Sequence, residues 1–148
     1  MMYSRQNSRA IAARFSAAAA TYHRDAFIQR QVAEKLSRFF PNQLAPRRIL
    51  EVGSGTGILT ELALRRYPGS RLDAVDISAR MIAQARARLP APRRLRWRVA
   101  DLRQAAGGGR YPLIISSSAL HWVAPLEEGL RRLADRLTPG GWLVFALM

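Results

Sequence analysis

Apolar residues follow two different spacings along this chain of 148 residues. In the amino-terminal part they recur at helical spacing, which predicts a short helix near residues 9–15 and an amphipathic helix near 25–40. From residue 48 onward, short apolar runs alternate with helical patterns. The runs predict strands at about 48–52, 71–76, 95–100, 113–117 and 142–146. The intervening segments predict helices at about 57–66, 78–89 and 125–137.

Strands that alternate with helices favour an α/β fold with a doubly wound parallel sheet, Rossmann-like in its winding. The run from Leu113 to Ser117 is almost continuously apolar, as expected for the buried centre of such a sheet. We expect about five strands, preceded by amino-terminal helices. Right-handed crossovers would place a ligand at the carboxyl ends of the strands. We divide the chain into a helical segment, 1–45, and one compact core, 46–148.

Three glycines alternate directly after the first predicted strand, at Gly53, Gly55 and Gly57. Glycine allows a tight turn and lets backbone N–H groups approach a ligand closely. A dinucleotide fingerprint has two residues between its second and third glycines, whereas this loop has one, and the lysine of a phosphate-binding P-loop is missing. The loop is therefore predicted to cradle a cofactor of another kind, although a glycine-rich turn can also be purely structural.

The stretch Glu51-Val-Gly-Ser-Gly-Thr-Gly57 resembles motif I of class I S-adenosyl-L-methionine-dependent methyltransferases. The ligand of that family carries an amino-acid end and a ribose but no phosphate. The resemblance implies that S-adenosyl-L-methionine is the cofactor. An acid about 20 residues further on, at the end of the next strand, would support this interpretation because it could bind the ribose hydroxyls.

Polar residues stand at the ends of the following predicted strands. Asp76 ends the second strand and supplies the expected ribose-binding acid. Asp101 follows the third strand and could accept a hydrogen bond from an adenine amino group, with the backbone N–H of Leu102 beside it. Ser116 and Ser117 end the fourth strand, where a methyl donor would lie. Each of these residues also has an ordinary structural explanation. The prediction therefore depends on the fact that the ends of four consecutive strands all supply residues suited to a cofactor site.

The formal net charge of the chain is +14, from 24 basic and 10 acidic residues, and every basic residue except Lys35 is an arginine. A field of this sign would attract nucleic acid, phosphates or an acidic protein. The arginines are spread along the chain without a dense block, however, and a GC-rich coding sequence would also favour them. A functional basic face and a compositional drift therefore both remain open.

Cysteine is absent from the sequence, which excludes disulfides, thiolate zinc sites and thiol nucleophiles. We expect no metal site. No apolar run approaches about 20 residues and the amino terminus has no apolar signal core, so we expect no membrane association and a cytoplasmic location.

Two further segments are similar to the malonyl-acyl-carrier-protein O-methyltransferases of biotin synthesis. They are Phe15-Ser-Ala-Ala-Ala-Ala-Thr-Tyr22, followed by Gln29-Arg30-Gln31, and Ser116-Ser-Ser-Ala-Leu-His-Trp122. The resemblance implies methyl transfer to the free carboxyl of a malonyl thioester on an acidic acyl-carrier protein. It also implies that the amino-terminal segment folds over the cofactor as a lid.

The resemblance assigns residues by position. The cofactor site would contain Glu51, Gly53, Ser54, Gly55, Gly57, Asp76, Ile77, Met81, Asp101, Leu102 and Ser116. The substrate side would contain Tyr22, His23, Ser117 and His121. No catalytic residue is assigned with certainty, because a carboxylate acceptor is already ionised at neutral pH and needs no general base.

The chain departs from that family in three places. His121 stands where glutamine is usual, and His-Trp-Val also occurs in aconitate-type methyltransferases of small acids. Pro112 replaces a usual aspartate. The last two strands of the family fold and a substrate-covering insertion are missing, so the edge of the fifth strand would be exposed unless a second copy covers it in a homodimer.

Two other functions therefore remain as alternatives to the carboxylate methyltransferase. An RNA methyltransferase would explain the charge, but nucleic acid is disfavoured because no Asn-Pro-Pro-Tyr-type motif follows the fourth strand. An inactive core that only binds the cofactor is the other alternative.

Overall fold

The computed structural model describes residues 8–14, 16–17, 27–90, 93–102, 109–120, 123 and 125–147. Residues 8–14 are helical, and the named elements then follow in chain order. They are α2 (Phe27–Ser37), β1 (Arg48–Val52), α3 (Ile58–Arg66), β2 (Arg71–Asp76), α4 (Ala79–Arg88), β3 (Leu95–Val99), β4 (Tyr111–Ser117), α5 (Leu126–Ala134) and β5 (Leu137–Ala146). No helix in these ranges is long and apolar enough to cross a membrane.

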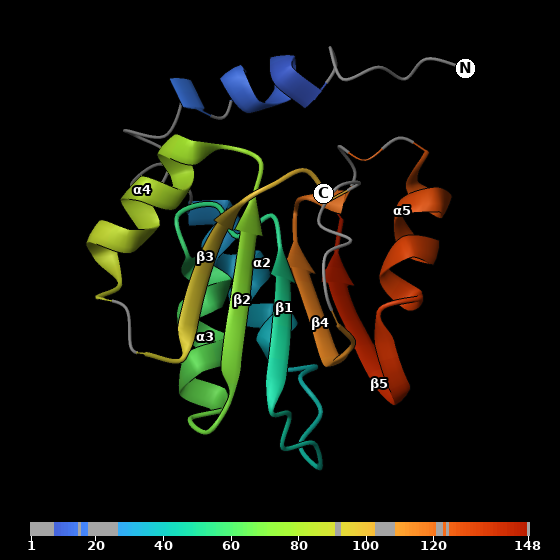
Figure 1. Ribbon diagram of the computed structural model, residues 1–148. Coiled ribbons are helices and arrows are strands. Elements are labelled where there is room, and N and C mark those ends of the chain that lie inside the picture. Colours follow the sequence, from blue (N-terminus) through green and yellow to red (C-terminus); the bar gives the residue numbers. More distant parts are fainter. Residues whose placement is uncertain are drawn as a thin grey trace.

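The five strands form one parallel sheet in the order β3-β2-β1-β4-β5 (Figure 1). The order reverses between β1 and β4, which is the point where open parallel sheets bind their ligands. The prediction of a doubly wound, Rossmann-like α/β sheet of about five strands is confirmed.

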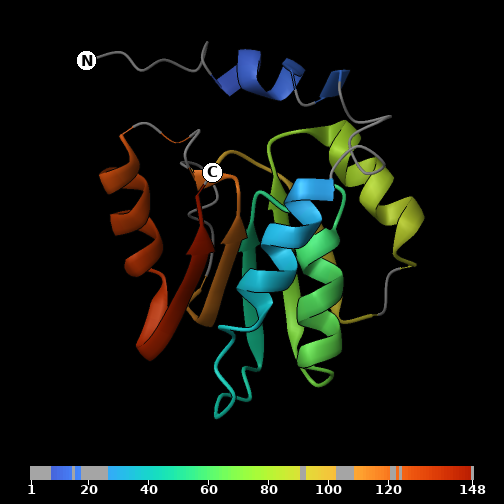
Figure 2. The same ribbon diagram turned by 180° about the vertical axis from the view of Figure 1, so that it is seen from behind.

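The sheet has two differently covered faces. We call the face under α2, α3 and α4 the back face; α2 and α3 lie behind the sheet in Figure 1 and in front of it in Figure 2. The front face packs against α5 through Leu133. Successive residues of a strand point to opposite faces, so Ile49 belongs to the back cluster and Leu50 to the front one. Both side chains are almost completely buried, and they fix the register of β1 in the core.

Predicted and observed boundaries differ most at the carboxyl end. The predicted helix extended to residue 137 and the last strand began at 142, but α5 ends at Ala134 and β5 begins at Leu137. Leu137 pairs with Tyr111, and the register then shifts before Trp142 pairs with Leu113. Residues 139–141, which lie between the predicted helix and the predicted strand, therefore form an irregularity inside β5 that the positive φ of Gly140, 73°, helps to accommodate.

The amino-terminal helical residues 8–14 lie beyond the carboxyl ends of the strands (Figures 1 and 2). The hydroxyl of Ser16 is 2.7 Å from that of Ser78, in a hydrogen bond between two segments distant in sequence. Ser78 is the N-cap of α4, and its Oγ accepts from the backbone N–H of Met81 at 3.3 Å. This contact holds residues 16–17 close to the end of β2.

Candidate functional site

The glycine loop after β1 packs tightly against the segment that follows β4. Gly53 has φ 72°, and a Cβ atom at this position would lie 2.1 Å from the Cβ of Ala119. Neither the backbone conformation nor the space admits a larger residue. Ser118 has φ 56°, which is uncommon for a residue with a side chain. The ends of β1 and β4 therefore meet at a tight contact that includes a strained backbone, and strain of this kind is common at functional sites.

Hydrogen bonds fasten the same loop to the end of β2. The backbone N–H groups of Gly53 and Ser54 both donate to the carbonyl of Val75, at 2.8 and 3.0 Å. The N–H of Gly55 donates to Oδ2 of Asp76 at 2.8 Å. We expected loop N–H groups to point at a ligand, but these three donate within the protein. The loop can instead offer a ligand close contact with its backbone and a hydrogen bond from the side chain of Ser54.

Asp76 is 9% exposed and anchors the loop while keeping acceptor capacity. Its Oδ1 accepts from the backbone N–H of Ser78 at 2.8 Å, and its Oδ2 accepts from Gly55. Burial raises the pKa of Asp76, and the backbone hydrogen bonds from Ser78, Gly55 and Ile77 oppose this shift in part. Because an ionised carboxylate offers about four acceptor positions, Asp76 can still accept from ligand hydroxyls.

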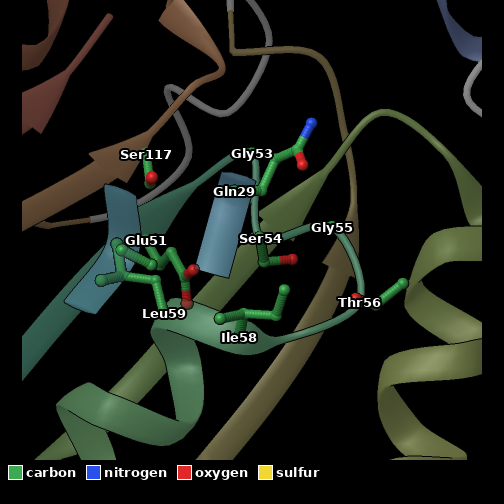
Figure 3. Close-up of a pocket in the computed structure, with 10 residues that line it drawn as sticks. Gln29, Glu51, Gly53, Ser54, Gly55, Thr56, Ile58, Leu59 and Ser117 are labelled. Carbon is green, nitrogen blue, oxygen red and sulfur yellow. The ribbon is translucent and has the colours of Figure 1, made fainter. Parts of the chain in front are cut away.

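A hollow opens between the glycine loop, α2 and the end of β4 (Figure 3). Together with the open solvent at its mouth, its empty space is about 330 Å³. Its lining consists of Gln29, Ala33, Glu51, Gly53, Ser54, Gly55, Thr56, Ile58, Leu59 and Ser117.

Two serine hydroxyls at this hollow favour a polar ligand. The Oγ atoms of Ser54 and Ser117 are buried and have no hydrogen-bond partner among the described residues. A buried hydroxyl without a partner is costly, so each is a natural position for a hydrogen bond to a ligand. With the carboxylate of Asp76 at the end of β2, hydrogen-bonded to the loop, these groups fit a ligand that carries hydroxyl, amino and carboxylate groups, as S-adenosyl-L-methionine does.

Glu51 lies in the wall of the hollow and is 1% exposed. The hydroxyl of Thr60 donates to its Oε2 at 2.5 Å. Burial raises the pKa of Glu51 to about 8, the hydrogen bond from Thr60 lowers it, and the charge of Asp76 raises it further. A positive charge placed in the hollow would favour the ionised carboxylate. Among the described lining residues Glu51 is the one titratable side chain, so the hollow suits a cationic ligand.

The other predicted cofactor residues lie around this hollow without lining it. Met81 is 1% exposed inside α4, and Gly57 is the N-cap of α3 with φ 87°. Ser116 is fully buried, and its hydroxyl donates to the carbonyl of Val52 at 2.9 Å. That hydroxyl is satisfied within the protein, in contrast to the hydroxyl of the neighbouring Ser117.

Three predicted residues follow β2 and β3 directly. Ile77 and Asp101 are partly exposed at the carboxyl edge, and Leu102 packs against the front cluster. A role of these residues in binding adenine or ribose stays a prediction. The substrate-side candidates Tyr22, His23 and His121 lie outside the described residues.

Sequence reasoning did not assign the contribution of α2 to the site. Gln29 and Ala33, one helical turn apart, both line the hollow, and Figure 3 shows the amide of Gln29 beside Gly53. The signal for this in the sequence is the segment Gln29-Arg30-Gln31, which the resemblance to the family includes but to which it assigns no role. In the described ranges, no three His, Cys, Asp or Glu side chains are grouped as they would be to hold a metal ion.

Comparison with known proteins identifies the family of the chain. Residues 50–143 match a family described as a methyltransferase domain. The chain is 42% identical over 142 residues to the biotin biosynthesis bifunctional protein BioCD of Bordetella avium, covering 95% of this chain and 30% of that protein. It is 38% identical over 134 residues to a malonyl-[acyl-carrier protein] O-methyltransferase of Halorhodospira halophila, covering 89% of this chain and 45% of the relative. A trans-aconitate 2-methyltransferase of Pseudomonas aeruginosa is 40% identical over 115 residues, covering 78% of this chain and 40% of that protein.

A solved structure shares the fold. The N-methyltransferase NodS of Bradyrhizobium japonicum, in complex with S-adenosyl-L-homocysteine, superposes with a TM-score of 0.69 at 26% identity, covering 78% of this chain and 60% of that one. The chain spans half or less of the length of the three curated relatives named above. The family match extends from β1 into β5 and includes the glycine loop and Asp76. The chain therefore belongs to the methyltransferase-domain family, whose cofactor is S-adenosyl-L-methionine.

Proposed function

We propose that this protein transfers a methyl group from S-adenosyl-L-methionine to the free carboxyl of malonyl-acyl-carrier protein, a reaction of biotin synthesis. The observation that carries the proposal is the similarity to relatives named for this reaction or this biosynthesis, at 38% and 42% identity over most of the chain. The hollow beside the glycine loop supports a cofactor of this chemistry.

The side chains at the site suit an acceptor that needs no deprotonation. A malonyl carboxyl is ionised at neutral pH, so the reaction depends on alignment and not on a general base. When bound, the cofactor supplies a methyl group activated on a positively charged sulfur. Asp76 would hold the ribose, while Ser54 and Ser117 would donate hydrogen bonds at the hollow. Aligning two bound reactants can contribute about 7–11 kcal/mol to lowering the barrier.

The amino-terminal segment would close this site. We propose that residues 1–45 form a lid over the core of residues 46–148, with Tyr22 and His23 facing the acceptor beside His121. The hydrogen bond between Ser16 and Ser78 supports the lid, because it lies two residues from Asp76. Excluding water favours the transition state, in which the opposite charges of sulfonium and carboxylate cancel. We expect the reaction to take place in the cytoplasm.

We also propose that a second copy of the chain covers the open edge of β5. β5 pairs with β4 on one side and ends the sheet in the described part of the chain. Trp142 is 53% exposed and Leu147 is 45% exposed. A homodimer through this edge stays a prediction, and light scattering at two protein concentrations would test it.

The decisive experiment incubates the protein with methyl-labelled S-adenosyl-L-methionine and malonyl-loaded carrier protein. We expect a labelled ester on the malonyl group that mild base hydrolyses, and none on unloaded carrier. Label on the unloaded carrier, or no label with the malonyl form, would contradict the proposal.

A second candidate acceptor is a small tricarboxylic acid. The 40% identity to the trans-aconitate methyltransferase favours it, as does His121 in the position discussed above. Faster ester formation with free trans-aconitate than with the malonyl carrier would establish this alternative. Labelled RNA would indicate a nucleic-acid methyltransferase. Calorimetric binding of the cofactor without methylation of any of these acceptors would indicate a binding core.

A further inference from the structure

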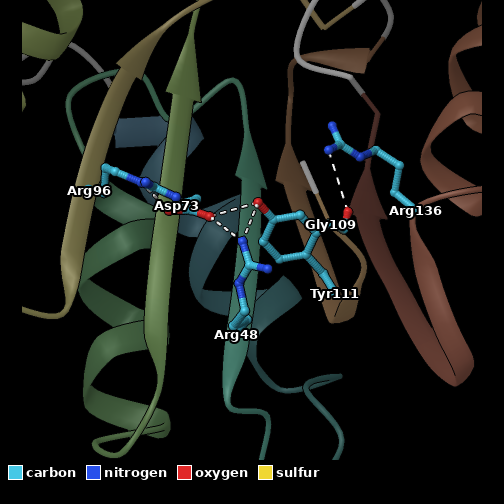
Figure 4. A network of polar contacts seen from close by, with 6 residues as sticks. All are labelled: Arg48, Asp73, Arg96, Gly109, Tyr111 and Arg136. Carbon is cyan, nitrogen blue, oxygen red and sulfur yellow. Dashed lines mark hydrogen bonds and ion pairs between the residues drawn. The ribbon is translucent and has the colours of Figure 1, made fainter. Parts of the chain in front are cut away.

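Arginine side chains gather on the front face of the sheet, away from the hollow. The alternation along each strand puts Arg48 of β1, Arg71 of β2, and Arg96 and Arg98 of β3 on this face. Arg136, directly before the first residue of β5, lies at the border of this face. We call these five residues the arginine face; part of it is drawn in Figure 4.

Asp73 lies among these arginines and is already neutralised. Its Oδ1 accepts from Nε of Arg96 at 2.9 Å, and its Oδ2 accepts from Nη2 of Arg48 at 3.2 Å and from the hydroxyl of Tyr111 at 2.7 Å. Burial raises the pKa of Asp73, but these three hydrogen bonds outweigh burial and hold the pKa below its usual value. Asp73 is therefore ionised, and its charge is matched by two guanidinium groups.

Tyr111 fixes the direction of two of the guanidinium groups. The Cζ atoms of Arg48 and Arg136 lie 4.6 and 5.8 Å from the centroid of its ring. Arg136 also donates to the carbonyl of Gly109 at 3.5 Å. Arginines held in this way lose less conformational entropy when they bind a partner.

The charge on this face exceeds what the fold uses. Arg48 and Arg71 are direct partners in the register of β1 and β2, and like charges in this position destabilise a sheet. The side chain of Arg96 is 65% exposed in spite of its ion pair, and that of Arg48 is 38% exposed. Five positive charges face Asp73 and the exposed Asp135 at the border. A surface that keeps such repulsion is suited to bind an acidic partner.

We propose that the arginine face is the docking surface for the acidic acyl-carrier protein, an inference that depends on the proposed function. The surface is positive, and the proposed partner is acidic. Asp73 and Asp76 belong to the same strand, so the centre of the face is about 10 Å from the carboxyl edge at the usual rise of a strand. A carrier bound here could pass its flexible prosthetic arm over the carboxyl edge of the sheet to the hollow on the back face.

The same observations favour a protein over nucleic acid as the partner. The arginines surround a buried carboxylate and do not form a continuous stripe, whereas a phosphate backbone would be tracked by successive basic groups.

The test is a charge reversal that spares the network and the cofactor site. The variant R71E/R98E changes two arginines of the face that do not hydrogen-bond to Asp73, whose side-chain partners are Arg48, Arg96 and Tyr111. A matched control, K35E/R38E, makes the same change in net charge at exposed positions near the end of α2, on the back face. Both variants should retain the circular dichroism spectrum and the affinity for S-adenosyl-L-homocysteine. Binding of malonyl-loaded carrier protein is then measured by calorimetry at low salt.

We expect R71E/R98E to weaken carrier binding by about tenfold or more and K35E/R38E to change it by less than about twofold. Methylation of malonyl-coenzyme A, which lacks the carrier, should stay the same in both variants. Equal carrier binding by R71E/R98E and the unaltered protein would overturn the inference, as would equal losses in the two variants. Loss of RNA retention in R71E/R98E with unchanged carrier binding would overturn it too and assign the face to nucleic acid.

Failure of the inference differs from failure of the proposed function. If the unaltered protein makes the malonyl ester on the carrier and R71E/R98E makes it with the same KM, the docking surface is wrong and the function stands. If carrier binding depends on the arginine face but no ester forms, the docking surface stands and the proposed reaction is wrong.

Discussion

Glu51 makes the stability of the fold depend on pH near neutrality. Burial raises the pKa of its carboxyl from 4.5 to about 8. Between these two values the folded protein keeps a proton that the unfolded chain has released. Because the folded state then binds more protons, the free energy of unfolding falls as the pH rises through this window. Replacing Glu51 with glutamine removes the ionisable carboxyl group and keeps the size of the side chain.

The size of the effect follows from the shift. Each unit of pKa difference corresponds to about 1.4 kcal/mol, so the unaltered protein should lose up to about 5 kcal/mol of stability between pH 4.5 and 8. The variant E51Q should lack this loss. Its amide oxygen can still accept from the hydroxyl of Thr60, while its amide N–H groups replace the carboxyl proton, so the two proteins should agree within about 1–3 kcal/mol near pH 5.

Urea unfolding followed by circular dichroism, at half-unit steps from about pH 5 to 9, measures the difference between the two proteins. We expect E51Q to become the more stable protein as the pH approaches 8. The comparison cancels other titrations. Asp73, whose pKa is lowered in the folded state, contributes stability that is present above about pH 3.8 and is lost only on acidification below that, outside the measured range. Parallel curves for the two proteins across this range would refute the reasoning, because they would show that Glu51 ionises alike in the folded and unfolded states.

Three other perturbations test the site. Gly53→Ala should lower the free energy of unfolding by at least about 2 kcal/mol, because of its positive φ and the contact with Ala119, and the added change Ala119→Gly should restore part of it in the same urea assay. Asp76→Asn should weaken binding of S-adenosyl-L-homocysteine about tenfold or more by calorimetry while the far-ultraviolet spectrum is kept, and unchanged affinity would exclude the ribose role. Ser117→Ala should leave stability unchanged or slightly higher, because its hydroxyl has no partner among the described residues, but should weaken ligand binding by about two- to tenfold. Equal affinity in that variant would mean that the hydroxyl faces no ligand.

Local pattern was sufficient to predict the centre of the fold. The predicted bounds of the first two strands coincide with β1 and β2, since a charged residue opens each apolar run and the glycine loop or Asp76 closes it. The start of β5 could not be predicted, because Pro139 and the two glycines after it have the composition of a turn. Pairing between Tyr111 and Leu137 extends the strand across that segment, and such pairing is a tertiary effect.

The site could be predicted only in part, for a similar reason. Parallel strands end at one edge, which is why the contact between Gly55 and Asp76 was foreseeable from their positions after β1 and β2. Which of two adjacent serines turns its hydroxyl toward the hollow is a matter of rotamers and neighbours, and Ser116 and Ser117 differ in this respect. The place of Gln29 depends on how α2 packs across the loop, which no spacing within the helix reveals.

The distribution of charge links the hollow to the chemistry that we propose. In a chain of net charge +14, the described lining of the hollow contains Glu51 and no arginine, while the arginine face lies on the other side of the sheet. Burial raises the pKa of both Glu51 and Asp76, so a cationic ligand that restores their charges gains more there than in water. Methyl transfer removes the positive charge from the sulfur of the ligand. The hollow should therefore bind S-adenosyl-L-methionine, which is cationic at sulfur, more tightly than S-adenosyl-L-homocysteine, which has lost the methyl group and that charge. The anionic partner would be attracted to a separate surface, so the cationic ligand and the anionic partner do not compete for one site.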